Sequence, residues 1–163
     1  MAQSNITIRQ AKPEDTALIL KFICMLAEYE KMLDDVQATE ELLLEWVFEK
    51  QKAEVLIGEI DGEPMGFALY FHNFSTFVGR AGIYLEDLFV LPEARGKGLG
   101  KKLLLTLAKL AVERGCGRLE WACLNWNEPS IGFYKSLGAV PMEEWTTYRV
   151  AGKTLTDLAD EAD

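Results

Sequence analysis

Between residues 82 and 114 the chain runs from an apolar strand through a glycine-rich turn directly into an amphipathic helix. The apolar run of the predicted strand indicates a central position in a sheet. The turn has glycine at every second position, at Gly96, Gly98 and Gly100. Glycines let the backbone approach a ligand closely, and the free N–H groups of a first helical turn can bind phosphate oxygens. This succession therefore predicts an anion-binding turn between a strand and a helix.

Two familiar nucleotide-binding motifs do not fit this turn. A Walker A loop needs Gly-x-x-x-x-Gly-Lys-Ser/Thr, and Gly100-Lys101-Lys102 supplies neither the upstream glycine nor the hydroxyl. A dinucleotide fingerprint needs Gly-x-Gly-x-x-Gly, and its third glycine would fall on Lys101 or Leu103. The pattern that does fit is Arg-x-x-Gly-x-Gly, which begins at Arg95.

Hydrophobic periodicity divides the rest of the chain into short strands and helices. Strands are expected at residues 6–9, 53–60, 64–71, 82–90 and 118–124, and two more are expected on either side of residues 144–147. Helices are expected at residues 13–33, 40–48, 98–114 and 129–137. Asp61-Gly62 is the strongest hairpin signal, and Thr39 is a predicted helix cap. With no linker or repeat, residues 1–163 are predicted to form a single α/β (α+β) domain, whose mixed, mostly antiparallel, twisted sheet is flanked by helices.

The balance of charge and hydropathy excludes several kinds of partner. The chain has 26 acidic and 17 basic residues, a net charge of −9. Such a surface repels phosphate backbones and would attract a polycation, although solubility alone also accounts for it. No stretch approaches the roughly 20 apolar residues of a membrane helix, and residues 1–10 lack the features of a signal peptide. We therefore expect a cytoplasmic protein that binds neither nucleic acid nor membrane.

The cysteines and the single histidine do not indicate a redox or metal centre. Cys24, Cys116 and Cys123 are odd in number and contain no Cys-x-x-Cys pair, and one histidine assembles no metal-ligand set. A catalytic cysteine needs a histidine base beside it, a part that His72 could play in principle. We interpret all four residues as structural and expect no metal.

Two adjacent carboxylates, Glu86 and Asp87, lie within the predicted central strand. Neighbouring side chains of a strand point to opposite faces, so at least one of the two is expected to face a cleft. Because a buried unpaired acid is costly, the alternative is an exposed edge position. Glu86 is the better candidate for contact with a ligand, and Asp87 is expected to hold the loop or a strand bulge.

Residues 125–135 contain a second candidate segment. Asn127 is expected to cap a short helix that has Pro129 inside its first turn. Phe133 and Tyr134 follow within this helix. An aromatic pair packed in the core is the commoner arrangement for such residues, and a functional tyrosine is the alternative.

Taken together, three motifs resemble those of a known family: Tyr-Leu-Glu-Asp-x-Phe-Val at 84–90, Arg-Gly-x-Gly-x-Gly at 95–100 and Trp-Asn-Glu-Pro-Ser-Ile-x-Phe-Tyr-Lys at 126–135. They are similar to those of the GNAT N-acetyltransferase superfamily, in its branch of spermidine/spermine (diamine) and thialysine N-epsilon-acetyltransferases. The likeness extends over residues 6–158. It implies acetyl-CoA as the acetyl donor, a small cationic amine as the acceptor, and a homodimer.

The resemblance also implies which residues form each part of the site. The coenzyme would meet Leu88, Phe89, Val90, Arg95, Gly96, Lys97, Gly98, Leu99, Gly100, Lys101, Asn127, Glu128, Pro129 and Ser130. The amine would meet Tyr29, Glu30, Glu86 and Glu144. The chain departs from the family in residues 73–81, which contain no acid, and in residues 145–163, which match loosely. Both segments border the acceptor pocket in the family, so the identity of the acceptor is what they affect.

The expected mechanism is direct attack of a neutral amine on the thioester, because no credible Cys–His or Ser–His pair is present. Glu86, acting through water, is the candidate base, and Asp87 is the alternative. A backbone N–H of residues 88–90 would stabilise the oxyanion. Tyr134 would donate its proton to the departing thiolate.

Two other functions fit the same residues. An acetyltransferase for a lysine-like amino acid or a peptide N-terminus would need a cation near Glu86 for the acceptor carboxylate, and Arg80 and Arg149 are candidates. A coenzyme-binding sensor that has lost catalysis is the alternative from another class of protein. The preferred amine, the nitrogen modified and the pathway do not follow from the sequence.

Overall fold

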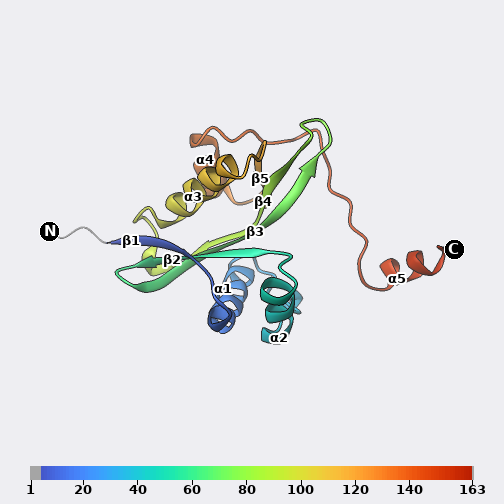
Figure 1. The fold of residues 1–163 in the computed structure, drawn as a ribbon, viewed down its shortest axis with the longest axis horizontal. Helices are drawn as coiled ribbons and strands as arrows, with labels where there is room; N and C mark the ends of the chain where they lie inside the picture. Colours follow the sequence, from blue (N-terminus) through green and yellow to red (C-terminus); the bar gives the residue numbers. More distant parts are fainter. Residues whose placement is uncertain (1–4, 163) are drawn as a thin grey trace. The chain divides into compact units, whose positions relative to one another are not determined.

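A five-stranded mixed sheet forms the centre of the first of two compact units, residues 1–122 and 123–163. The computed structural model describes residues 5–162. The strands are β1 (Ile6–Gln10), β2 (Glu54–Ile60), β3 (Glu63–Ser75), β4 (Arg80–Val90) and β5 (Leu119–Trp121). They lie in chain order across the sheet; β1 to β4 are antiparallel, and β5 is parallel to β4 (Figure 1). The predicted mixed, mostly antiparallel sheet is therefore confirmed.

Helices cover both faces of this sheet. Figure 1 shows α1 (Thr16–Tyr29) and α2 (Glu40–Leu43) on one face and α3 (Leu99–Glu113) on the other. Short helical turns connect these elements: 3-10 turns at Pro13–Asp15, Leu33–Asp35 and Pro92–Ala94, and a π-helical turn at Leu44–Glu49 that continues α2. Such a three-layer arrangement buries both faces of the sheet, as the apolar run of β4 predicts.

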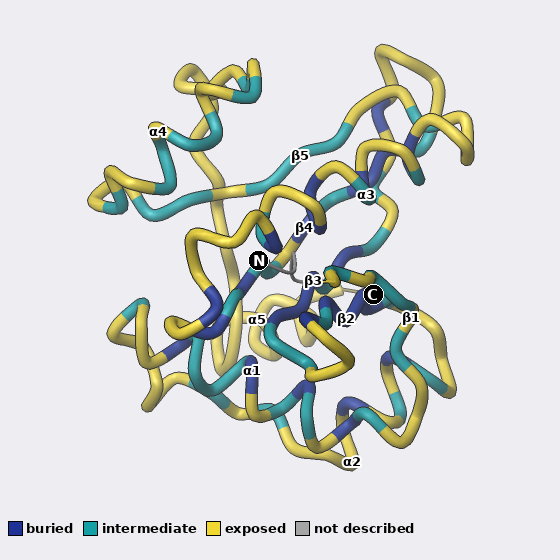
Figure 2. Tube along the Cα trace, turned by 90° about the vertical axis from the view of Figure 1, so that its left-hand side faces the viewer, coloured by how far each residue is buried: buried dark blue, intermediate teal, exposed yellow. Residues whose placement is uncertain are grey.

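Aromatic packing joins α1 to the sheet. Phe22 of α1 stacks on Phe67 of β3, with 5.5 Å between ring centroids, and its ring lies 6.3 Å from that of Phe89 of β4. Phe67 and Phe89 are opposite each other in the β3–β4 register, so both face α1. Figure 2 shows the buried residues concentrated in the central strands and in the helix sides that face them. The end of β4 is thereby fixed against α1.

Close packing on the other face fixes the start of α3. Leu99, Leu103 and Leu107 are almost completely buried. A Cβ atom added to Gly58 would lie 2.6 Å from Leu99 Cδ1, and one added to Gly66 would lie 2.6 Å from Phe89 O. Real Cβ atoms do not approach neighbours so closely, so glycine at both positions lets α3 begin directly on the sheet.

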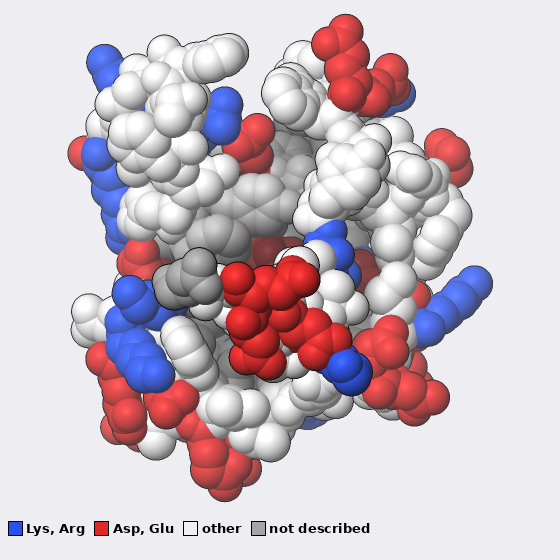
Figure 3. Space-filling model, turned by 90° about the vertical axis from the view of Figure 1, so that its right-hand side faces the viewer, with Lys and Arg blue, Asp and Glu red and all other residues white. Residues whose placement is uncertain are grey.

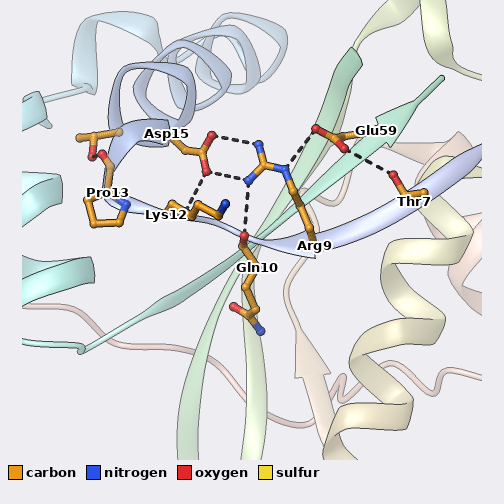
Figure 4. A network of polar contacts seen from close by, with 8 residues as sticks. Thr7, Arg9, Gln10, Lys12, Pro13, Asp15 and Glu59 are labelled. Carbon is orange, nitrogen blue, oxygen red and sulfur yellow. Dashed lines mark hydrogen bonds and ion pairs between the residues drawn. The ribbon is translucent and has the colours of Figure 1, made fainter. Parts of the chain in front are cut away.

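An ion-pair network fastens β1 to the start of α1 (Figure 4). The Arg9 guanidinium donates to both carboxylate oxygens of Asp15, at 2.8 and 3.0 Å, and to Glu59 Oε2 at 3.1 Å. The Lys12 backbone N–H also donates to Asp15, at 2.7 Å. These hydrogen bonds, those of Arg9 above all, lower the pKa of the Asp15 carboxyl.

Replacing Asp15 with asparagine should lower the free energy of unfolding at pH 7 by about 1–2 kcal/mol, because the charge-assisted bonds to Arg9 are lost. A lowered pKa stabilises the folded state only while the carboxyl is ionised, so the difference from wild type should shrink as the pH falls below about 4. Urea unfolding at pH 7 and pH 3 measures both effects. Glu14→Gln removes the same charge from the same turn and should change stability by less than about 0.5 kcal/mol; equal losses in both variants would contradict the role of the network.

The second unit contains α4 (Glu128–Ser136) and α5 (Gly152–Asp160). The prediction of two strands on either side of residues 144–147 is wrong, because residues 139–151 form no strand. Pro141 has no N–H to offer to a ladder, and the next residues form a turn in which the Trp145 N–H donates to Met142 O. Helix α5 lies where we expected no helix.

Candidate active site

A β-bulge separates two halves of strand β4. Leu69 of β3 lies opposite Asp87, whereas the next residue, Tyr70, lies opposite Leu85. Glu86 is therefore the extra residue of β4, and no residue of β3 lies opposite it. Bulges are common beside active sites, where they redirect side chains. Here the exposed Glu86 and the half-buried Asp87 are adjacent at the irregularity.

Three carboxyl groups lie close enough at this bulge to influence one another. Burial raises the pKa of Asp87 to about 6, and the charges of Glu86 and Glu30 add to the effect. Burial, followed by the charge of Glu86, also raises the pKa of Glu30, the C-cap residue of α1. The structure thus brings together Glu30 and Glu86, two of the residues expected at the amine, and adds Asp87 to them.

An ammonium group is the natural ligand for this arrangement. Neighbouring carboxylates repel each other when ionised, which adds to the effect of burial on the pKa values of Glu30 and Asp87, and a bound cation relieves that repulsion. The phenol of Tyr84, on the same strand, is under the same influence: burial and then the charges of Glu86 and Glu120 raise its pKa. Figure 3 shows acidic and basic side chains interspersed with uncharged ones on one face of the molecule. The carboxyl cluster of Glu30, Glu86 and Asp87, hereafter the acid cluster, favours a cationic ligand.

Arg95 links the end of β4 to the end of α1. Its guanidinium carbon lies 5.2 Å from the centroid of the Tyr29 ring and 5.7 Å from that of the Phe89 ring, both within range of a cation–π interaction. Its Nε donates to the carbonyl oxygen of Val90 at 3.1 Å. The exposed Tyr29, expected at the amine, is therefore held beside Arg95, a residue that the motif indicated only for the coenzyme.

The glycine turn has the geometry of an anion site. Gly96 and Gly98 have φ angles of 80° and 89°, and Gly98 is the N-cap of α3. Lys102 N donates to Gly98 O at 3.0 Å, which begins the helical ladder. The N–H groups of Leu99, Gly100 and Lys101 precede this bond and so have no partner within the helix. Such N–H groups at the start of a helix fit the phosphates of a coenzyme.

Strand β4 has an open edge beyond the bulge. Leu88, Phe89 and Val90 pair with β3 on one side. On the other side β5 pairs with β4 only at Ile83, Tyr84 and Leu85. Within residues 5–162 no strand continues this pairing along residues 86–90, so this stretch of β4 has no strand partner on that side. This is the edge from which a backbone N–H was expected to stabilise an oxyanion.

Sequence comparison identifies the family to which this chain belongs. The model of the Acetyltransferase (GNAT) family matches residues 22–139. The chain belongs to this family. It is 39% identical to the thialysine N-epsilon-acetyltransferase of Sus scrofa over 96% of this chain and 98% of that protein. It is 30% identical to the L-ornithine N5-acetyltransferase NATA1 of Arabidopsis thaliana, over 91% of this chain and 85% of that protein.

Solved structures agree with the fold. An integron cassette protein from the mobile metagenome of V. cholerae superposes with a TM-score of 0.80 at 32% identity, covering 96% of this chain and 98% of that one. The molecule is therefore an acetyl-CoA-dependent N-acetyltransferase with a GNAT fold. The resemblance inferred from the three motifs is confirmed.

The other predicted site residues of this acetyltransferase belong to its second unit. Asn127 is at the N-cap position of α4, but its side chain makes no capping hydrogen bond. Glu128 and Pro129 form the first turn. Tyr134 is half-buried in the same helix, and its ring centroid lies 5.6 Å from that of Phe133. Ser130 is also on this helix, and Glu144 is exposed in the segment between α4 and α5.

The residues expected to be structural are half-buried or hydrogen-bonded. Cys24, Cys116 and Cys123 are half-buried, and His72 Nε2 lies 3.2 Å from Arg114 Nη1. Between residues 5 and 162 no group of three or more metal-ligating side chains could hold an ion. In the same range no helix is long and apolar enough to cross a membrane.

Proposed function

We propose that this acetyltransferase moves the acetyl group of acetyl-CoA to a primary amine of a small cationic metabolite. The observation that carries the proposal is the acid cluster of Glu30, Glu86 and Asp87, in which burial and neighbouring carboxylates raise the pKa values of Glu30 and Asp87. A small molecule with more than one positive charge would relieve this repulsion at several points. The names of the relatives, thialysine and L-ornithine acetyltransferases, also support a small amine acceptor.

Acetyl-CoA would supply the reactive thioester, and this chain would hold it through two backbone regions. The N–H groups at the start of α3, freed by the positive φ angles of Gly96 and Gly98, would bind its pyrophosphate. The open edge of β4 from Glu86 to Val90 would pair with its amide groups. Residues assigned to the coenzyme are Leu88, Phe89, Val90, Arg95, Gly96, Lys97, Gly98, Leu99, Gly100, Lys101, Asn127, Glu128, Pro129 and Ser130.

The chemistry is a direct transfer. An alkyl ammonium has a pKa near ~10.4, so the site must take up a proton before the nitrogen can attack. Glu86, exposed at the bulge, would accept that proton through a water molecule. As the nitrogen–carbon bond forms, a β4 backbone N–H would stabilise the oxyanion. The carbon–sulfur bond then breaks, and Tyr134 would give its phenolic proton to the leaving thiolate.

The acceptor site comprises Tyr29, Glu30, Glu86 and, by resemblance to the family, Glu144. A diamine or polyamine needs acids at both ends, whereas an amino acid with a side-chain amine also needs a cation for its carboxylate. Arg80 is a poor candidate for that cation, because six residues along β4 separate it from Glu86, about 20 Å in a strand. We propose that the two units function as a single domain, and that the protein is a cytoplasmic homodimer.

Titration with acetyl-CoA in a calorimeter, followed by assays with diamines, polyamines, thialysine, ornithine and lysine, tests this function. We expect heat of binding from acetyl-CoA and release of free coenzyme A with at least one of these amines. Binding of acetyl-CoA without turnover of any amine would instead favour the non-catalytic sensor. Failure of acetyl-CoA to bind would contradict both.

A further inference from the structure

A cavity of about 420 Å³ opens at the edge of the sheet where β1 ends. It lies between Gln10, the last residue of β1, Glu54, the first residue of β2, and the π-helical turn at Leu44–Glu49. Val47 and Val55 line it and are almost completely buried. Cavities of roughly 300–1,000 Å³ with a mostly apolar lining are the usual sites of small ligands. This cavity therefore has the size and lining of a small-molecule site.

The cavity is separate from the acetyl-transfer site. Arg114, which follows the last residue of α3, forms an ion pair with Glu54 at the cavity. The glycine turn precedes the first residue of the same helix, and the 15 residues of α3 span about 22 Å between them. Strand β3 also separates β2 from β4, the strand of Glu86 and Asp87. A molecule in the cavity would therefore meet neither the phosphate-binding turn nor the acid cluster.

The cavity offers no unpaired charge. Among the described residues that line it, only Glu54 is ionisable. Both of its carboxylate oxygens accept hydrogen bonds from the Arg114 guanidinium, at 2.7 and 2.8 Å. This bidentate pair satisfies the charge within the protein. An ionised ligand would have to leave water without a partner of opposite charge, which is costly, so the cavity favours a neutral molecule.

Two glutamine amides at the rim provide hydrogen-bonding groups. Gln10 and Gln51 both line the cavity and are exposed. Gln10 Nε2 donates to the Tyr70 hydroxyl at 3.2 Å, whereas the Gln51 side chain forms no hydrogen bond with another residue from 5 to 162. A primary amide has two N–H donors and a carbonyl acceptor. Gln51 can therefore exchange a pair of hydrogen bonds with the amide of a ligand.

The backbone of Gln51 has a conformation that favours glycine. Its φ angle of 53° lies in the left-handed region, and it follows Lys50, the C-cap of the π-helical turn. Glycine is the usual residue directly after a helix C-cap, because it has no Cβ atom to oppose this conformation. The chain thus holds a glutamine side chain at the rim despite local strain, and strained residues are concentrated at functional sites.

We propose that this cavity binds a neutral small molecule in which a carboxamide is attached to an apolar ring. The ring packs against Phe48 and against the two buried valines, Val47 and Val55. The carboxamide exchanges hydrogen bonds with Gln51 at the rim. This site is additional to the acetyl-transfer site and does not depend on the proposed function.

Benzamide and benzoate are a matched pair of probes, because they share the ring and nearly the same shape and only benzoate is charged at pH 7. Each is titrated into the full-length, ¹⁵N-labelled protein, and the backbone amide resonances are followed by NMR. Benzamide should shift the resonances of residues 10–11 and 47–55 in a saturable way and leave those of residues 96–101 unchanged. Benzoate should bind at least about tenfold more weakly, because its charge has no partner in the cavity.

Replacing Gln51 with glycine tests the rim amide without the risk of unfolding. The substitution removes the backbone strain and should raise the Tm by about 2 °C. It should also weaken benzamide binding about fivefold, because the hydrogen bonds to the carboxamide are lost. Lys31→Gly is the matched control, since Lys31 is also a left-handed residue, with a φ angle of 62°, and lies outside the cavity. Its affinity for benzamide should equal that of wild type.

Three results would overturn the proposal. The first is the absence of saturable shifts at residues 10–11 and 47–55, or shifts at residues 96–101 instead, which would place benzamide at the donor site. The second is benzoate binding as tight as that of benzamide. The third is an unchanged benzamide affinity in Gln51→Gly. Release of coenzyme A from acetyl-CoA with an amine acceptor is measured separately, so failure of this site would leave the proposed acetyl transfer intact.

Discussion

Replacing Tyr134 with phenylalanine should lower kcat by about 10²-fold or more and leave the affinity for acetyl-CoA nearly unchanged. The substitution removes one hydroxyl and keeps the ring that lies beside Phe133. Without that hydroxyl, coenzyme A must leave as an unprotonated thiolate or take a proton from water. The loss should therefore appear in the chemical step rather than in binding.

Single-turnover kinetics and calorimetry with acetyl-CoA separate these two quantities. Ser136→Ala is a control, since it removes an exposed hydroxyl from the same helix, and its kcat should stay within about twofold of wild type. A wild-type rate in Tyr134→Phe would remove Tyr134 from the mechanism. A large loss of acetyl-CoA affinity would instead make it a binding residue.

Replacing Asp87 with asparagine should stabilise the protein above pH 7 by as much as about 3 kcal/mol while lowering its activity. The folded state raises the pKa of this carboxyl from 3.8 to about 6, so folding favours its protonated form. An upward shift of about two units corresponds to about 3 kcal/mol. Between pH 4 and pH 6 the folded state binds the extra proton, and wild-type stability therefore falls as the pH rises through this window. Asparagine carries no such charge and avoids that loss.

Urea unfolding at pH 4 and pH 8 measures this effect. The variant and wild type should differ little at pH 4 and most at pH 8. Asp160→Asn changes an exposed aspartate of α5 and should show no comparable dependence. Equal differences at both pH values would contradict burial of a charged Asp87. Increased stability with reduced turnover would identify the acid cluster as a part of the fold that is strained for function.

The sequence predicts most of the fold because the structure that each short segment favours by itself is also the structure that it adopts in the folded chain. Thr39 was expected to cap a helix, and its Oγ1 accepts a hydrogen bond from Leu42 N at 3.1 Å. Asp61 and Gly62 form the β2–β3 turn with positive φ angles, as their hairpin signal predicts. The residues after Leu43 were expected to continue an α-helix but form a π-helical turn. Side-chain periodicity does not distinguish an α-helix from a π-helical turn, because the spans of their backbone hydrogen bonds differ by only one residue.

The candidate site, like the fold, could be predicted from the sequence only in part. Composition and spacing identify the glycine turn and the pair Glu86 and Asp87, because these residues are neighbours in the chain. The bulge at Glu86 depends on the register between β3 and β4, which no short motif encodes. The stacking of Arg95 on Tyr29 joins residues that are distant in sequence, so only the folded chain reveals it.

Gly66 has a consequence that extends well beyond its own strand. Any side chain there would meet Phe89 O at 2.6 Å, Leu99 Cδ2 at 3.3 Å and Val90 Cα at 3.3 Å. Because Gly66 has no Cβ atom, the last residues of β4 and the first residue of α3 can pack directly against β3. A bulkier residue at this position would displace the start of α3 and, with it, the glycine turn. Substitutions at position 66, natural or selected, would then change the affinity for acetyl-CoA through the position of the glycine turn.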